Sequence, residues 1–189
     1  AERENVKDYE HFNDFFTRSL KKTSRPISSL PVISPVDGVV SQAGKINKSE
    51  IVQAKGKKYS VSTLLDDKSI DTSYFNSFTT IYLSPKDYHR IHMPCDGDLV
   101  SMKYIPGDLF SVNQRTVNGI DQVFARNERL VCFFNTEFGE VAFILVGAIF
   151  VGSMQTTWEG QITPPYSKSV KHYNYMDQKI RLEKGDELG

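Results

Sequence analysis

Residues 129–151 read RLVCFFNTEFGEVAFILVGAIFV, and this stretch decides the fold. Two apolar runs rich in β-branched and aromatic residues flank Phe138-Gly139, where glycine supplies the positive φ that a tight turn needs. We predict strands at 129–136 and 140–158 on either side of this turn. Strands joined by tight turns pair antiparallel, so the stretch predicts an antiparallel sheet.

Shorter runs of the same kind lie on both sides of this hairpin, next to turn residues such as Asp37-Gly38 and Asp96-Gly97. They predict further strands at 31–36, 38–46, 50–56, 78–84, 97–105 and 178–184. Helical patterns return briefly at 61–67 and at 84–92. The predicted fold class is α+β, dominated by antiparallel sheets with barrel-sandwich-like elements, in one body at residues 27–189.

Composition limits the function. The 189 residues carry 23 Lys plus Arg and 23 Asp plus Glu, a formal net charge of zero, which removes the basic footprint expected of a nucleic-acid-binding protein. The longest apolar run, 141–151, is shorter than the about 20 residues that cross a bilayer. The chain begins without an apolar leader, so we expect a soluble chain or a truncated one. Cys95 and Cys132 have no CxxC spacing, and we expect both to be buried thiols in a reducing compartment.

The first 26 residues differ in character from the rest. One helical face carries the apolar side chains Tyr9, Phe12, Phe16 and Leu20, widened by Phe15. Basic residues follow before Pro26 prevents continuation, namely Arg18, Lys21, Lys22 and Arg25. Segment 1–26 is therefore predicted to form an amphipathic helix of about three turns. Two interpretations stay open: its aromatic face docks on the body, or it faces lipid while the cations meet anionic head groups.

The segment SPKDYHRIHMP, residues 84–94, carries the most chemical information. Ser84 suits an N-cap, proline suits the first helical position, and Pro94 limits a helix here to about two turns. His89 and His92 are three residues apart. On a helix their side chains would lie about 60° apart and point to the same side. The pattern predicts a short helix that bears two histidines able to share a site.

Three uses of this histidine pair compete. A zinc site would need further ligands, which Asp37, Cys95 or His172 could supply, but HxxH lacks the glutamate and the i, i+4 spacing of the zincin helix. Acid–base chemistry needs no metal, because imidazole titrates near neutral pH. The third use is purely structural, as partly buried polar groups. Asp37 taken alone is a turn residue before glycine.

Several longer stretches, taken together, resemble the larger β chain of bacterial-type phosphatidylserine decarboxylase. They cover nearly the whole chain: FNDFFTRSL with RPI, PVDGVVSQAGKI, IVQAKGKKYS, YLSPKDYHRIHMPCDG, YIPGDLFSVN, VFARNERLVCFFNTEFG, VGAIFVGSMQTTWEG and KGDELG. The resemblance implies a proenzyme that cuts itself before a serine of a Leu-Gly-Ser motif. That serine becomes a pyruvoyl group at the N-terminus of a separate α chain, so the cofactor lies outside this chain.

The resemblance also assigns roles to three residues. His92 would be the general base that deprotonates the serine hydroxyl and would lie against the cofactor, and Asp37 would hold that imidazole in the required tautomer. His89 would face the substrate and help deliver a proton after carbon dioxide leaves a Schiff base between the pyruvoyl ketone and the substrate amine. No metal is expected.

Further expectations follow from the same resemblance. The partners would be the α chain, phosphatidylserine and the cytoplasmic face of the cell membrane, where the protein would be peripheral, with α–β units forming a homodimer. The chain stops at Gly189, and we expect KGDELG to be a turn a few residues before the cut. We also expect a hydrophobic portion to precede Ala1 in the whole protein.

Two other functions stay open as alternatives. A zinc-dependent hydrolase would use Asp37, His89 and His92 as ligands. A barrel-sandwich carrier module would be modified on a lysine, and Lys68 follows an acidic residue as a lipoyl lysine does. Candidates for contact with a substrate phosphate, or else for ordinary surface ion pairs, are Arg90, Arg126 and Arg129.

Overall fold

The structure, a computed structural model, describes residues 1–54 and 56–189. Within these residues the strands are β1 (Val39–Lys45), β2 (Glu50–Ala54), β3 (Lys57–Ser60), β4 (Ser77–Tyr82), β5 (Gly97–Ile105), β6 (Arg129–Thr136), β7 (Gly139–Val146), β8 (Met154–Thr156), β9 (Gly160–Thr163), β10 (Lys171–Asn174) and β11 (Arg181–Leu182). The helices are short, namely α1 (Phe12–Phe16), α2 (Val61–Leu65), α3 (Gln114–Gly119) and α4 (Val123–Arg126), with 3-10 turns η1 (Val6–Asp8) and η2 (Thr72–Tyr74).

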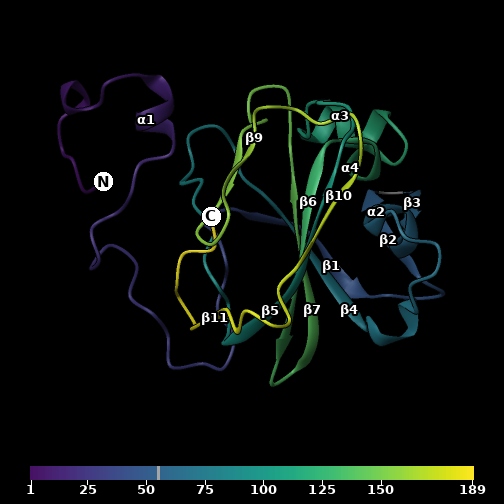
Figure 1. The fold of residues 1–189 in the computed structure, drawn as a ribbon. Helices are drawn as coiled ribbons and strands as arrows, with labels where there is room; N and C mark the ends of the chain where they lie inside the picture. The colour runs from purple at the N-terminus through teal and green to yellow at the C-terminus, as the bar shows by residue number, and fades with distance from the viewer. Residues whose placement is uncertain (55) are drawn as a thin grey trace.

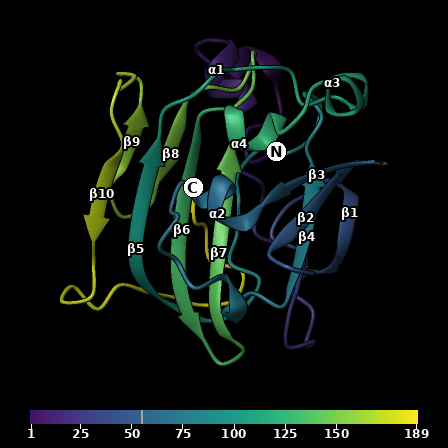
Figure 2. The ribbon, with the colours of Figure 1, turned by 90° about the vertical axis from the view of Figure 1, so that its right-hand side faces the viewer.

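The largest sheet is antiparallel and is ordered β10-β5-β6-β7, with β11 also paired to β5 (Figure 2). Its central strand β6 is buried on both faces. Leu130, Cys132 and Phe134 point into one apolar cluster, whereas Val131 points into the other. A strand covered on both faces reads as a continuous apolar run, which is why this stretch of sequence predicts the sheet so well.

Three two-stranded sheets surround the large one, and they pair β1 with β4, β2 with β3, and β8 with β9. Helix α2 packs against β3 and α4 at one end of the molecule (Figure 1). The prediction of an α+β fold dominated by antiparallel strands is confirmed. The β5 and β6 bounds equal the predicted ranges 97–105 and 129–136.

Other predicted elements differ from the structure. The predicted strand 140–158 is divided, because β7 ends at Val146 and the chain makes a tight hairpin in which Ala148 and Val151 exchange both backbone hydrogen bonds before β8. Residues 31–36 form no regular strand. The sequence patterns missed β3, β9, β10, α3 and α4. The expectation that both cysteines are buried thiols is confirmed.

The N-terminal segment lies to one side of the sheets (Figure 1). The predicted three-turn helix is wrong in length, because α1 spans only five residues. Arg90 Nε donates to the carbonyl of Thr17, and the N–H of Glu2 donates to that of Ser19. Partners from outside the helix thus engage the backbone beyond Phe16. None of the helices in the described residues is long and apolar enough to span a membrane.

Candidate functional site

The histidine-bearing segment forms a turn followed by irregular backbone, so the predicted helix at 84–92 is wrong. Its start behaves as expected only locally: the Asp87 carboxylate accepts a hydrogen bond from the Ser84 N–H at 2.7 Å, and a turn follows. Beyond the turn the backbone pairs with other parts of the chain. The helical argument that His89 and His92 point to one side therefore no longer holds.

Three segments far apart in sequence meet at His92. The His92 N–H donates to Pro35 O at 2.8 Å, which joins segment 91–94 to segment 33–35. On the other side, segment 185–189 runs antiparallel to 91–93, with backbone bonds of 2.7–2.8 Å. His92 is thus held in an irregular three-segment array that includes the last residues of the chain.

Two partners hold the His92 ring. Its Nδ1 lies 2.9 Å from the carbonyl oxygen of Gly185, and its Nε2 lies 3.0 Å from the hydroxyl of Tyr88. A carbonyl oxygen can only accept, so Nδ1 carries the proton. The neutral ring then has its lone pair on Nε2, which is the nitrogen that could take up a proton.

Asp37 lies directly before β1, where Gly38 comes so close to Tyr82 that a Cβ would sit 2.8 Å from the carbonyl oxygen. The Asp37 carboxylate pairs with Arg25, whose Nε lies 2.8 and 2.9 Å from its two oxygens. This guanidinium lowers the pKa of Asp37, and a smaller lowering comes from the charge of His92. Among the described residues no hydrogen bond joins Asp37 to His92, and the carbonyl of Gly185 accepts the Nδ1 hydrogen bond.

A hollow of about 520 Å³ opens beside Asp37. Its lining comes from the start of β1, the end of β4 and the turn before the histidines: Asp37, Gly38, Val39, Tyr82, Ser84, Lys86 and Asp87. The Ser84 hydroxyl is buried without a hydrogen-bond partner among the described residues.

His89 has different partners from His92. Its ring lies against Phe16 of α1, with centroids 4.1 Å apart, and its Nδ1 lies 3.0 Å from the carbonyl oxygen of Asp87. Burial lowers the pKa of His89 below its ordinary value. The aromatic face of the N-terminal segment thus docks on the body through a candidate site residue.

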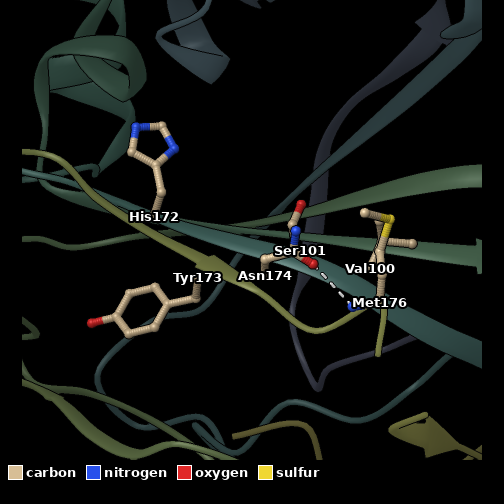
Figure 3. Close-up of a pocket in the computed structure, with 6 residues that line it drawn as sticks. All are labelled: Val100, Ser101, His172, Tyr173, Asn174 and Met176. Carbon is tan, nitrogen blue, oxygen red and sulfur yellow. Dashed lines mark hydrogen bonds between the residues drawn. The ribbon is translucent and has the colours of Figure 1, made fainter. Parts of the chain in front are cut away.

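The geometry gives little support to the two alternative functions, a zinc-dependent hydrolase and a carrier module. Among residues 1–54 and 56–189, no group of three or more His, Cys, Asp and Glu side chains is placed to hold a metal ion. His172 lies on β10 in another hollow of about 380 Å³, where its ring and that of Tyr173 project to opposite sides of the strand (Figure 3). Lys68 lies in the loop after α2 and not at a hairpin tip, the position that a carrier lysine would need.

The three arginines proposed for phosphate contact are all engaged by the protein. Arg129 is only 3% exposed and donates to the backbone carbonyls of residues 63, 64 and 127, so it is a structural residue. Arg90 pairs with Glu187, and Arg126 pairs with Asp108. Four further residues contact the predicted site residues, and no sequence pattern marks them as part of the site. They are Arg25, Tyr88, Phe16 and Gly185.

Comparison with known proteins identifies relatives along the whole chain. The sequence model of the family described as phosphatidylserine decarboxylase matches residues 12–189. Proteins named phosphatidylserine decarboxylase proenzyme are 54% identical in Nitrosococcus oceani and 50% identical in Acidovorax ebreus, both over 100% of the chain, and 52% identical in Methylobacillus flagellatus over 97% of it. The chain spans about two thirds of these relatives' own length, at 63%, 68% and 66% respectively.

Proposed function

Since the chain belongs to the phosphatidylserine decarboxylase family, we propose that it forms the larger part of an enzyme that converts phosphatidylserine to phosphatidylethanolamine and carbon dioxide. The family consists of decarboxylases, and the relatives described above are named proenzymes. The observation that carries the proposal is the placing of His92, with Asp37 close by, next to segment 185–189.

In this proposal His92 is the base for self-cleavage of the proenzyme. The Gly185 carbonyl keeps the proton on Nδ1, so Nε2 can take the proton of a serine hydroxyl supplied by the continuing chain. The backbone pairing of 185–189 with 91–93 supports this role, since it leads the chain past His92. The smaller product of the cut is the proposed α-chain partner.

Asp37 supplies negative charge to the site. Its pairing with Arg25 favours the ionised carboxylate, and an ionised carboxylate near His92 stabilises the imidazolium that forms when Nε2 is protonated. This electrostatic role needs no direct hydrogen bond between Asp37 and His92.

The hollow beside Asp37 suits a pyruvoyl group on the α chain. Asp37 lines it, and His92 lies against segment 185–189, from which the chain would continue to the junction. Such a group would supply an electron sink for the bond that breaks when carbon dioxide leaves. On the substrate side His89, whose pKa burial lowers, would take up a proton at Nε2 and return it to the carbon that carbon dioxide leaves.

The proposal also includes a membrane surface. Phe12 is 75% exposed on α1, and Lys22 follows ten residues later, while Lys21 pairs with Glu4. An exposed aromatic next to cations suits the interface of a bilayer with anionic head groups. We propose that the protein binds peripherally at the cytoplasmic face of the cell membrane. As a test, the protein should sediment together with phosphatidylglycerol vesicles. We also propose that two α–β units form a homodimer, which analytical ultracentrifugation can test.

The deciding experiment uses the whole proenzyme. Intact mass should find two chains, the smaller blocked at its N-terminus. His92→Ala and Asp37→Ala should leave an uncut precursor, while His89→Ala should be cut but decarboxylate phosphatidylserine poorly. His172→Ala, in the other hollow, is the matched control and should behave as the parent protein does. Equal cleavage and equal activity in all four variants would refute the assignment, and zinc at near one atom per chain would favour a hydrolase instead.

A further inference from the structure

Tyr88 contacts His92, the proposed base, and has no role in the function proposed above. Its side chain is 7% exposed, and its hydroxyl lies 3.0 Å from Nε2 of His92. The two rings are stacked, with centroids 5.7 Å apart and planes 25° apart. Both a polar and a packing contact therefore join Tyr88 to the proposed base.

The direction of this hydrogen bond follows from the other side of the ring. Because the Gly185 carbonyl fixes the proton on Nδ1, the neutral imidazole presents a lone pair at Nε2, and the phenol must be the donor. Burial, and secondly the charge of Glu187, raises the pKa of Tyr88, so the phenol keeps its proton at neutral pH.

We propose that Tyr88 is a positioning residue for self-cleavage, which holds the His92 ring so that Nδ1–H faces Gly185 and Nε2 remains the basic nitrogen. The inference rests on the proposed role of His92 as the base. With one hydrogen bond on each nitrogen, the ring cannot turn over without losing both of them, and the stacked phenol packs against its face. When the serine hydroxyl arrives it replaces the phenol at Nε2 and transfers its proton there.

The test is Tyr88→Phe in the whole proenzyme, which keeps the stacked ring and removes only the hydroxyl. Self-cleavage should slow by up to about tenfold, because the ring orientation and tautomer that react are populated less once this hydrogen bond is lost. In matured enzyme labelled with ¹⁵N-histidine, the signals assigned to His92 should change from the single Nδ1–H tautomer to a mixture. Tyr74→Phe is the matched control, because Tyr74 is 73% exposed, and it should change neither readout.

The outcomes separate this inference from the proposed function. Unchanged cleavage in Tyr88→Phe overturns the inference, and so does slower cleavage with an unchanged His92 spectrum, which would leave Tyr88 a merely structural role. Normal cleavage in His92→Ala would instead overturn the proposed base itself. Slower cleavage together with mixed tautomers supports Tyr88 as the residue that positions His92.

Discussion

Gly185 supports the proposed base from the side opposite Tyr88, and replacing it by alanine tests how much that support matters. Its φ is +93°, its N–H donates to Met93 O at 2.8 Å, and its carbonyl accepts from His92 Nδ1 at 2.9 Å. A residue with a Cβ loses about 1–2 kcal/mol in this region of φ. The added Cβ would also lie 2.9 Å from Cδ1 of Ile27, an exposed side chain that can move aside.

Gly185→Ala can lower its backbone strain by rotating the peptide that carries the Gly185 carbonyl, which removes the acceptor from Nδ1. We therefore expect two effects in the whole proenzyme. The free energy of unfolding in urea should fall by about 1–2 kcal/mol. Self-cleavage, followed by the appearance of two chains in intact mass, should slow by about fivefold to tenfold because the tautomer of His92 is no longer fixed.

Gly139→Ala is the matched control. Gly139 lies in the β6–β7 turn with a similar φ of +99°, and a Cβ added there would meet no atom of the described residues within 4 Å. It should lose the same stability as Gly185→Ala but cleave at the parent rate. Equal cleavage rates in the two variants would refute the reasoning that the Gly185 carbonyl positions the base.

Two more predictions concern the N-terminal segment. Arg25→Gln removes the main cause of the lowered pKa of Asp37, so that pKa should rise. In a plot of cleavage rate against pH, the acid limb should then move to higher pH. An unmoved limb would show that the Arg25–Asp37 pair has no electrostatic role. The stability that this carboxylate contributes is present above its unfolded pKa and lost as pH falls, and the variant should lose less of it in acid. Phe16→Ala should let water reach His89 and raise its pKa in an NMR titration, whereas Phe12→Ala, at an exposed position, should not; equal titration curves would contradict this.

The sequence predicts strand boundaries best for strands that have a neighbouring strand on each side. Strands β5 and β6 lie inside the sheet, most of their residues are buried, and their ends coincide with the predicted ranges. Shorter edge elements such as β9 and β10 have four residues each and mixed burial, so their sequences carry no clear period. Periodicity reports burial, and an edge element is buried only in part.

The failure at residues 84–92 has a different cause. One local contact of a helix start is present, since Asp87 accepts from the Ser84 N–H, but the predicted N-cap is not made, because the Ser84 hydroxyl has no partner among the described residues. The backbone groups that a helix would use are taken instead by long-range partners, with Ile91 bonded to residues 188 and 189 and His92 bonded to Pro35. Local propensity is worth only tenths of a kcal/mol per residue, and such tertiary pairing outweighs it.

The candidate site shows the same division between what a pattern can and cannot predict. The resemblance assigns roles to Asp37, His89 and His92, and these roles stay predictions. Their orientation depends on contacts from distant parts of the chain, as Arg25 on Asp37 and Phe16 on His89 illustrate. Both contacts cross from segment 1–26 into the body at 27–189, so the environment of the proposed catalytic residues is built from both parts, and no local stretch of sequence contains it.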